Sequence, residues 1–413
     1  MKKVIVIGAG AAGLMAAVHA AKCGAKVTVL EKMNRVGKKL LITGKGRCNI
    51  TNVANQQEFI KNMTGNGAFL YSSFSQYNND EVINFFHDLG VLTKVERGGR
   101  VFPVSDKAAD VVGAFMRAVN RLDIDIIKEQ AVDEILLEHH KVVGVKSSSG
   151  ARYDADAVIV STGGASYPAT GSSGDGYKLA NKLGHSIVDI HPSLVPLETE
   201  EEWVKDAQGL SLKNVRATIL VNGIKAGEDF GEMLFTHYGV SGPIILSLSK
   251  IVSANLGVNN LIELVINLKP ALTEEVLDKR IQRDFEKFIR KQIKNSLGSL
   301  LPAKLIDIVM DLAYLDPDKS VNQVTKEERQ RLIETITKLT LTIKGTRPVS
   351  EAIVTAGGIN VKEINPKTME SKLVDGLYFA GEAIDIDGFT GGFNLQAAFS
   401  TGYVAGQNAA LMD

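Results

Sequence analysis

The chain has no excess of charge of either sign. Its 413 residues include 47 lysines and arginines and 47 aspartates and glutamates. It therefore lacks the basic field that attracts nucleic acid or an anionic membrane surface. We expect a small-molecule substrate, no nucleic-acid partner and no membrane partner, and the composition leaves the oligomeric state open.

Cysteine is also scarce, because the chain contains only Cys23 and Cys48. Two cysteines are too few for a disulfide framework. They form no C-x-x-C pair, so a dithiol mechanism has little support, although basic neighbours favour the thiolate of Cys48. Cys23 falls at the end of a helix-like segment, where we expect it to be buried as a small apolar residue.

Long uninterrupted apolar runs are missing as well. Val4 to Ala21 carries no charge and follows Lys2 and Lys3, as in a signal peptide. However, this run contains three glycines and His19, changes from a strand pattern to a helix pattern, and has no cleavage region. Hydrophobic residues make up 45% of the chain, enough for a large core. We expect a cytoplasmic protein of two or three domains.

The N-terminal segment has the pattern of a dinucleotide-binding turn. An apolar run leads into Gly8-Ala9-Gly10-Ala11-Ala12-Gly13, and a helix-like stretch follows. These glycines permit a sharp turn, close approach of the backbone to a pyrophosphate, and tight packing of helix on sheet. The start of the helix offers unpaired N–H groups to the phosphates. Glu31, at the end of a second apolar run, is placed to accept hydrogen bonds from ribose hydroxyls.

The C-terminal segment contains a second glycine-rich loop. Gly376 to Glu382 is typical of a strand that enters a loop, and Gly391-Gly392-Phe393-Asn394 precedes an alanine-rich helix-like stretch. We predict that Glu382 and Asp385 accept hydrogen bonds from ribityl hydroxyls, and that the helix dipole stabilises negative charge on a reduced isoalloxazine ring. Asp385 and Asp387 alone are compatible with a metal pair, but no histidine accompanies them, so we expect no metal. The two segments together favour FAD.

The segment Arg35 to Asn52 gathers five cations without an intervening acid. It leaves the second predicted strand at its carboxyl end, where ligands bind in doubly wound folds. An ordinary surface loop with solvated cations is the alternative, but such a gathering is costly unless an anion lies among the charges. We therefore expect this segment to contact the cofactor, with Cys48 as a small residue that lines the site.

Further contacts are expected where other strands end. Ala155 to Ser161 is an apolar strand that ends in Thr162-Gly163-Gly164, although a plain strand-to-turn junction explains these residues nearly as well. Val132 is expected to present its backbone to the adenine ring. The predicted cofactor residues are Gly8, Gly10, Ala11, Ala12, Gly13, Glu31, Lys32, Lys38, Thr43, Gly44, Arg47, Cys48, Asn49, Val132, Thr162, Gly163, Gly164, Gly381, Glu382, Asp385, Gly391, Gly392, Phe393 and Asn394.

The middle of the chain differs from its two ends. Strand and helix signals alternate over residues 1–190 and return over 346–413. This pattern predicts a discontinuous, Rossmann-like α/β domain with three layers and a mostly parallel sheet. Residues 191–345 are then an inserted domain, which we expect to lie over the flavin side of the first.

The predicted insertion has two parts. Residues 191 to about 270 are rich in strand signals, with Asn222-Gly223 as a hairpin turn. Residues 271–345 are predicted to form a small helical bundle, in which Thr325 and Glu328 make a capping box. The helices are expected at 273–296, 302–313 and 326–339.

Four segments together carry a resemblance to a known family. They are Gly8–Gly13 with Glu31, Thr43–Asn52, Phe235–Pro243 and Gly381–Gln396. Over essentially the whole chain, they resemble the BaiN/YhiN-like family of bacterial NAD(P)/FAD-dependent oxidoreductases. The resemblance implies an FAD domain interrupted by an inserted domain. Lys45 stands where the family more often has a glycine.

The function expected from these features is that of an FAD-dependent oxidoreductase. It would transfer hydride through flavin N5 to or from a small organic substrate, with NAD(P)H as a dissociable electron donor. No second strand-G-x-G-x-x-G-helix unit is present, so NAD(P)H would bind elsewhere, or electrons would come from another source. A flavin-dependent tRNA-modifying enzyme and a non-catalytic flavin-binding redox sensor are the alternatives.

The stretch Phe235-Thr236-His237-Tyr238 is the candidate for substrate chemistry in the insertion. A histidine donates or accepts a proton near neutral pH, and Tyr238 is suited to orient a carbonyl group. A lone histidine beside glycines is more often structural, so both interpretations of His237 stay open.

Overall fold

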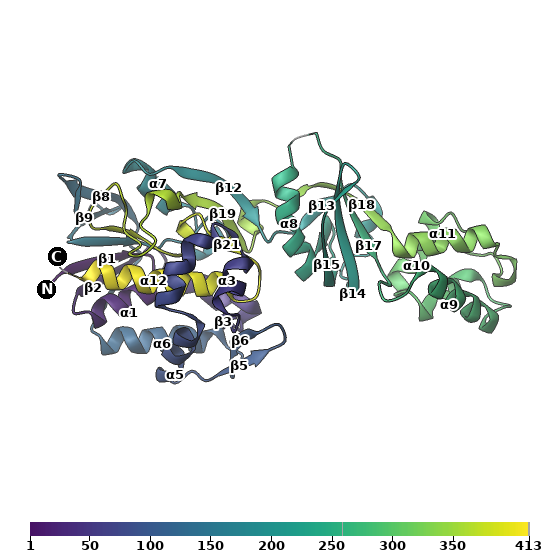
Figure 1. Ribbon diagram of the computed structural model, residues 1–413, viewed down its shortest axis with the longest axis horizontal. Coiled ribbons are helices and arrows are strands. Elements are labelled where there is room, and N and C mark those ends of the chain that lie inside the picture. The colour runs from purple at the N-terminus through teal and green to yellow at the C-terminus, as the bar shows by residue number, and fades with distance from the viewer. Residues whose placement is uncertain (258, 412–413) are drawn as a thin grey trace. The chain divides into compact units, whose positions relative to one another are not determined.

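The chain divides into two compact units in the computed structural model, which describes residues 1–257 and 259–411 (Figure 1). Unit 1 comprises Met1–Pro192 and Val349–Asp413, and unit 2 comprises Ser193–Pro348. Unit 1 is thus discontinuous in sequence and unit 2 is an insertion within it. The sequence-based prediction placed the two limits at residues 190 and 346.

Within the described residues, unit 1 is built on a five-stranded parallel sheet. Its strand order is β20-β11-β1-β2-β7, so β20, from the C-terminal segment, lies in the same sheet as the first strand. The mostly parallel Rossmann-like sheet that the sequence predicts is confirmed. The strands are β1 (Lys3–Ile7), β2 (Lys26–Glu31), β7 (Asp125–Lys128), β11 (Ala157–Val160) and β20 (Leu377–Phe379).

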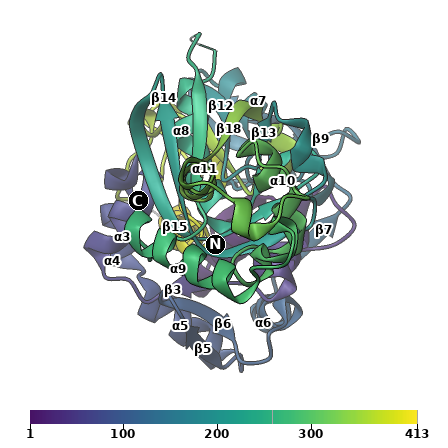
Figure 2. The same ribbon diagram turned by 90° about the vertical axis from the view of Figure 1, so that its right-hand side faces the viewer.

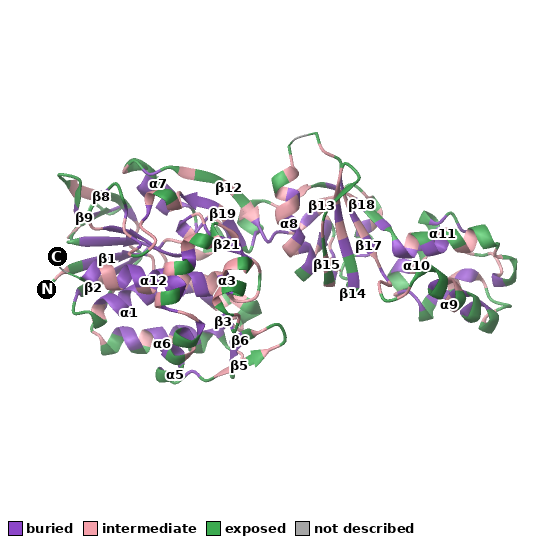
Figure 3. Cartoon of the chain, in the orientation of Figure 1, coloured by how far each residue is buried: buried purple, intermediate pink, exposed green. Residues whose placement is uncertain are grey.

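Alternate side chains of β1 enter the cores on the two faces of this sheet. Val4 and Val6 pack on the side of α1 (Ala11–Lys22), α6 (Ala108–Arg121) and α12 (Phe393–Ala410). Ile5 and Ile7 pack on the opposite side. The purple colour of β1 in Figure 3 marks it as buried between the two layers. That side is covered by α7 and an antiparallel sheet, namely α7 (Asp175–Lys182), β8 (Val132–Glu138), β9 (Lys141–Ser147) and β10 (Arg152–Asp154). Three layers result.

Shorter elements complete unit 1. The antiparallel sheet β3-β6-β5 contains β3 (Thr51–Asn52), β6 (Arg100–Pro103) and β5 (Thr93–Glu96). The others are α2 (Lys38–Ile42), α3 (Gln56–Asn62), β4 (Met63–Gly65), α4 (Tyr71–Gln76), α5 (Asn79–Asp88), β12 (Ile187–Ser193), β19 (Val354–Ile359) and β21 (Asp387–Gly388). Strand β12 pairs with β19, and β21 pairs with β4.

Helices α1 and α12 pack so closely that only glycine fits at the contact. A Cβ atom on Gly402 would overlap the carbonyl oxygen of Ala12, and one on Gly406 would overlap that of Ala16. Gly406 follows Gly402 by four residues, and Ala16 follows Ala12 by four residues, so the two helices run in the same direction. The first and last segments of unit 1 therefore share one core.

Unit 2 contains, in its described residues, a closed antiparallel barrel with strand order β13-β16-β15-β14-β17-β18. Asn222 and Gly223 form the predicted hairpin turn between β14 and β15, and both have positive φ (51° and 77°). This is the geometry that a two-residue hairpin requires. The strands are β13 (Leu197–Thr199), β14 (Ser211–Val221), β15 (Ile224–Phe235), β16 (Gly239–Ser241), β17 (Ile262–Asn267) and β18 (Leu339–Thr346).

A small group of helices follows β17, and α9, α10 and α11 lie together in Figure 2. The predicted capping box at the start of α11 is present, because Thr325 accepts from the backbone of Glu328 and Glu328 from the backbone of Thr325. The helices of unit 2 are α8 (Pro243–Asn255), α9 (Glu274–Lys287), α10 (Ala303–Leu312) and α11 (Lys326–Thr337).

Three details of unit 2 differ from the sequence-based prediction. Residues 339–346 are strand β18, which closes the barrel, so the helical part does not extend to 345. Helix α8 lies inside the part predicted as β-rich. Helix α9 ends at Lys287, and short 3-10 turns replace the rest of the helix predicted to reach 296. Across the described part of the chain, no helix is both long and apolar enough to span a membrane.

Candidate functional site

The first candidate element is the turn between β1 and α1. Gly8 has φ = 100°, and a Cβ atom there would lie 2.7 Å from the carbonyl oxygen of Ser161. A Cβ atom on Gly13 would overlap the carbonyl oxygen of Gly8. Gly10 differs, because a Cβ atom on it would meet no protein atom within 4 Å. Gly10 is also the N-cap of α1, so the open space adjoins unpaired N–H groups of Ala11 and Ala12.

Glu31 ends β2 beside this turn and its side chain is buried. Its carboxylate accepts hydrogen bonds from the backbone N–H of Ala9 (2.7 Å) and of Met33 (2.8 Å). The carbonyl oxygen of Glu31 accepts from Gln130 N–H (2.9 Å), two residues before Val132 at the start of β8. The structure therefore brings Glu31 and Val132 to the same edge of the parallel sheet as Gly10.

The second candidate element is the loop after β20, which lies against the first. Gly381 has φ = 72°, and a Cβ atom there would lie 2.7 Å from Cβ of Ala12. Glu382 accepts hydrogen bonds from Lys39 Nζ (2.6 Å) and from the N–H of Thr355 (2.8 Å). The Asp385 carboxylate accepts from Asn66 Nδ2 (2.7 Å). Residues from both ends of the chain therefore meet here.

The third candidate element is the start of α12. Gly391 and Gly392 have φ values of 127° and 101°, and a Cβ atom on Gly392 would overlap the carbonyl oxygen of Thr51. Asn394 fixes the loop, because its side chain accepts from Gly388 N–H (2.8 Å) and donates to Gly388 O (2.7 Å). Phe393 is buried in the core that contains Phe59. Its side chain is therefore structural, and only its backbone is free to face a ligand.

The glycine segment after β11 lies between these elements. Gly163 has φ = 72°, and a Cβ atom on Gly164 would overlap the Thr355 side chain and approach Glu382 to 3.0 Å. A Cβ atom on Gly176 would overlap the Thr162 hydroxyl, so Thr162 packs against the start of α7. These residues share the edge of the sheet with Gly8 and Glu382.

The cations of segment 35–52 require a correction. Arg47 is paired with Glu96 and with Asp106 (2.7 Å), Lys39 with Glu382 (2.6 Å), and nearby Lys32 with Asp175 (2.5 Å). Hydrogen bonds from Lys94 and Arg47 lower the pKa of Asp106 below its ordinary value. The chain thus supplies acids that lie far away in sequence, and the gathering of charge does not by itself require an anionic ligand.

Four more residues of this segment are predicted to contact the cofactor, namely Lys38, Thr43, Gly44 and Asn49. Lys38 begins α2, and the Thr43 hydroxyl donates to Leu40 O (2.7 Å), which closes the end of that helix. Gly44 has φ = 56° and packs beside Asn49. Asn49 Oδ1 is buried and accepts no hydrogen bond within the described residues, so it is an acceptor in need of a donor.

Both expectations for the cysteines were wrong. Cys48 is fully buried in the core with α1 and α6, and burial raises the pKa of its thiol to about 12. Its side chain therefore does not line a site, and its thiolate is disfavoured. Cys23 caps the C-terminal end of α1 and is exposed.

In unit 2, His237 and Tyr238 form the tight connection between β15 and β16. His237 is exposed, and its ring contacts that of Tyr238 edge-on, with 4.8 Å between centroids. Arg347 lies over the Tyr238 ring at 4.7 Å and pairs with Glu198 (2.6 Å). Sequence reasoning missed Arg347 and Glu198, because β13 and β18 bring them to Tyr238 from distant positions and no local motif marks them.

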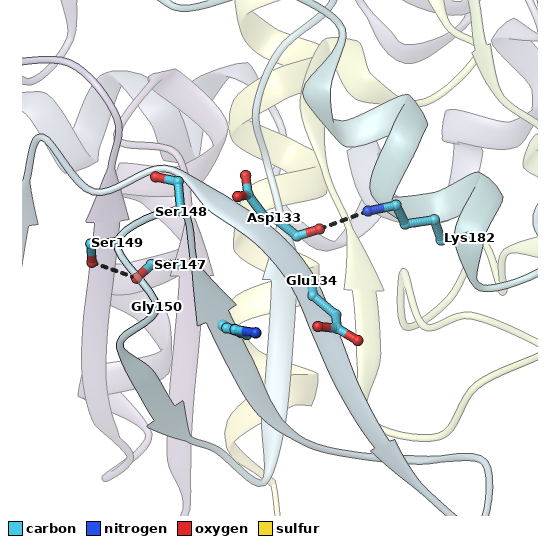
Figure 4. Close-up of a pocket in the computed structure, with 8 residues that line it drawn as sticks. Asp133, Glu134, Ser147, Ser148, Ser149, Gly150 and Lys182 are labelled. Atoms are coloured by element: carbon cyan, nitrogen blue, oxygen red, sulfur yellow. Dashed lines mark hydrogen bonds between the residues drawn. The ribbon is translucent and has the colours of Figure 1, made fainter.

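A polar hollow of about 430 Å³ opens in unit 1 among β8, the β9–β10 turn and α7 (Figure 4). Lys182 Nζ donates to the carbonyl oxygen of Asp133 (3.0 Å) across it. No predicted cofactor or substrate residue is among those that line it in the described chain, so we assign it no chemistry. In the same residues, no group of three or more His, Cys, Asp or Glu side chains is arranged to hold a metal ion.

Known proteins are similar to this chain over its full length. A reductase from Clostridium scindens, the 3-dehydro-bile acid delta(4,6)-reductase, is 32% identical and covers 99% of both chains. The ribosomal RNA dihydrouridine synthase of Haemophilus influenzae is 29% identical over 97% of this chain and 96% of its own. Among solved structures, the 3-ketosteroid-delta4-(5alpha)-dehydrogenase of Rhodococcus jostii RHA1 superposes with a TM-score of 0.55 and 15% identity, covering 100% of this chain and 97% of that one.

The solved structure supports the fold alone at this level of identity. The model of the HI0933-like protein Rossmann domain family matches residues 2–408, which is nearly the whole chain. The chain therefore belongs to the HI0933-like family and is an FAD-dependent oxidoreductase.

Proposed function

We propose that this protein reduces a carbon–carbon double bond conjugated to a carbonyl group, with FAD as its redox cofactor and NAD(P)H as electron donor. The observation that carries the proposal is the convergence of Gly10, Glu31 and the α12 N-terminus in one unit. The names of the relatives supply the class of bond.

The described residues fit an elongated dinucleotide. The open space at Gly10 suits a pyrophosphate at the start of α1, and the buried carboxylate of Glu31 suits ribose hydroxyls. Gly402 of α12 contacts Ala12 of α1, and Phe393 lies nine residues before Gly402 in α12. At a rise of about 1.5 Å per residue, the N-terminus of α12 is about 14 Å along the helix axis from the level of Ala12. Only an elongated ligand reaches both positions.

The orphaned acceptor of Asn49 supports the same assignment. Its buried Oδ1 would accept a hydrogen bond from an N–H or O–H group of the cofactor. Lys39, Glu382 and Thr355 are held by one another and would set the shape of the loop that the cofactor meets. In this proposal Glu382 positions the loop through these hydrogen bonds.

The N-terminus of α12 would provide the electrostatics of the reaction. Gly391 and Gly392 keep side chains away from its first N–H groups, and the positive end of the helix dipole favours negative charge beside it. FAD bound there would supply hydride from its N5 atom to the substrate.

Two relatives act on different substrates but reduce the same type of bond. One reduces a 3-oxo bile acid whose double bonds start at carbons 4 and 6, and the other makes dihydrouridine, which is uridine reduced at its ring double bond. In both cases the reduced bond is conjugated to a carbonyl group. We infer that this chain acts on the same arrangement in a small organic molecule.

His237 is the proposed proton donor and Tyr238 a group that orients the substrate carbonyl. His237 is exposed and Tyr238 is held by the guanidinium of Arg347. The substitution His237→Ala should lower turnover about 10²- to 10⁴-fold, the range of general acid catalysis, and leave bound flavin unchanged. Unchanged turnover with flavin in place would remove His237 from the mechanism.

The main test uses the purified full-length protein. It should be yellow, and anaerobic mixing with NADH or NADPH should bleach the flavin absorbance. A conjugated ketone added next should restore that absorbance and give a product two mass units heavier. A colourless preparation that takes up no FAD would contradict the cofactor assignment, and bleaching without reoxidation by any conjugated carbonyl compound would contradict the substrate class.

A second candidate is reduction of uridine in ribosomal RNA. The full-length similarity to the dihydrouridine synthase of Haemophilus influenzae favours it. The neutral net charge favours a small substrate instead. Incubating FAD-loaded protein and NADPH with ribosomal RNA, followed by mass spectrometry of nucleosides, separates the two: dihydrouridine appears only if RNA is a substrate.

A further inference from the structure

The sheet β3-β6-β5 holds a cluster of charged side chains with one unmatched cation. Arg47 pairs closely with Glu96 and with Asp106 (2.7 Å), and Lys94 pairs closely with Asp106 (2.6 Å) and lies 3.9 Å from Glu96. Arg100 approaches Glu96 only to 3.9 Å. Three cations therefore face two acids, and the surplus positive charge falls on Arg100. Its side chain is 45% exposed, so the charge is open to a ligand.

This surplus charge lies next to the loop that begins α12. Asn52 is the cross-strand partner of Arg100, so their side chains leave the same face of the sheet about 5 Å apart at Cβ. Asn52 Nδ2 donates to the carbonyl oxygens of Gly98 and Gly391, each at 3.0 Å. One amide group therefore ties the turn before Arg100 to Gly391.

The direction of the Arg100 side chain is partly fixed. Its Nε donates to the carbonyl oxygen of Arg97 (3.0 Å), and its guanidinium lies 5.7 Å from the centre of the Phe102 ring, on which Arg47 also stacks. The terminal nitrogens of Arg100 remain available for a second partner beyond the distant Glu96. A planar guanidinium held in this way suits an oxygen that carries negative charge.

We propose that Arg100 binds the carbonyl oxygen of the substrate, an inference that rests on the function proposed above. When hydride forms a new C–H bond at the carbon β to the carbonyl, the electron pair of the C=C bond shifts toward the carbonyl oxygen. Arg100 stabilises the negative charge that develops there. A proton then adds to the α carbon and completes the two-electron reduction, for which NAD(P)H is the reductant.

The test uses phenols, whose phenolate forms resemble the charged oxygen on an unsaturated carbon, and it does not depend on turnover. Titration of oxidised, FAD-loaded protein with 4-chlorophenol is followed by the long-wavelength charge-transfer absorbance. The substitution Arg100→Gln should weaken phenolate binding at least about tenfold, as expected for loss of a charge-assisted hydrogen bond. Arg100→Lys should restore part of the affinity, and Arg97→Gln is the matched control, expected to stay within about twofold.

Four outcomes decide the matter. Loss of phenolate affinity in Arg100→Gln, with flavin content and unfolding temperature equal to those of the control, supports the proposal. Equal affinity in Arg100→Gln and wild-type protein overturns it, and so does wild-type protein that binds no phenolate. If the wild-type protein binds phenolate through Arg100 but reduces no conjugated ketone, the proposed reaction fails and the anion-binding role of Arg100 stands.

Discussion

His19 is a buried histidine on α1 whose ring packs against those of Tyr403 and Tyr77, at 4.5 and 5.4 Å between centroids. Burial, helped by Lys22, lowers its pKa to about 3 from the ordinary 6.5. Because the unfolded chain binds this proton more readily, the contribution of His19 to stability is full above about pH 6.5. It declines as the pH falls from there toward 3, by up to about 1.4 kcal/mol per pH unit.

The substitution His19→Leu should therefore flatten the pH dependence of stability. Urea unfolding between pH 5 and 7 would show a smaller decline in the free energy of unfolding than in wild-type protein. His87, which is exposed on α5, gives the control His87→Gln, which should keep the wild-type slope. Equal slopes in all three proteins would show that His19 is not the group responsible.

Lys45 occupies a position better suited to glycine. It has φ = 58° and ψ = 41° and its side chain is exposed. The left-handed conformation costs about 1–2 kcal/mol for a residue with a Cβ atom, and part of this is offset by the extra chain entropy that glycine loses on folding. Lys45→Gly should raise the free energy of unfolding by about 1 kcal/mol, measured by urea denaturation. Lys45→Ala keeps the Cβ atom and should bring no gain; equal gains in both variants would refute the explanation.

The sequence indicated which positions need glycine for backbone reasons. It did not indicate which acids pair with the charged residues. Gly8, Gly13 and Gly392 are glycines because backbone atoms lie where a Cβ atom would be, and short motifs mark such positions. The acids that neutralise Arg47 and Lys39 are 49 to 343 positions away along the chain. Pairing at that distance is set by the fold. The cations of residues 35–52 therefore suggested an anionic ligand, although acids of the chain itself are their partners.

At the scale of elements, the packing of α12 on α1 leads to a prediction. The substitution Gly402→Ala places a methyl group on the carbonyl oxygen of Ala12, so the helices must move apart. We expect a loss of about 1–3 kcal/mol of stability, as for other overpacked cores, together with lower flavin content. Thermal unfolding and the ratio of flavin to protein absorbance measure both.

Gly113 is the matched control for this substitution. It also lies within a helix, α6, but a Cβ atom there would meet only the end of the Arg117 side chain, at 3.5 Å. Gly113→Ala should therefore stabilise the protein by about 0.5–1 kcal/mol through helix propensity. If both alanine variants behave alike, the close approach of α1 and α12 does not limit the packing.

Elements with local signals were predicted well and those with distant partners were not. The hairpin turn at Asn222-Gly223 and the capping box at Thr325 follow from neighbouring residues alone. Closure of the barrel needs β18 to pair with β13 and with β17, across more than seventy residues of intervening chain. No periodicity within residues 339–346 reveals those partners.

At the scale of the whole molecule, unit 2 has a core of its own. Its buried residues come from the barrel strands, from α8 to α11 and from short turns between these elements, all within residues 193–348. A fragment of these residues should fold cooperatively and remain colourless with added FAD, while the full-length protein turns yellow. Circular dichroism and flavin fluorescence test the two expectations. A fragment without cooperative unfolding, or one that retains FAD, would contradict this division of the chain.

The crossings between the units have a consequence for how such proteins diversify. Strands β12 and β19, which lead out of and back into unit 1, are neighbours in one small sheet, and β13 and β18 are neighbours in the barrel. Residues 193–348 therefore form one continuous insertion between two paired strands of unit 1, β12 and β19. Recombination at two points would therefore add, exchange or remove this module without altering the order of the parallel sheet.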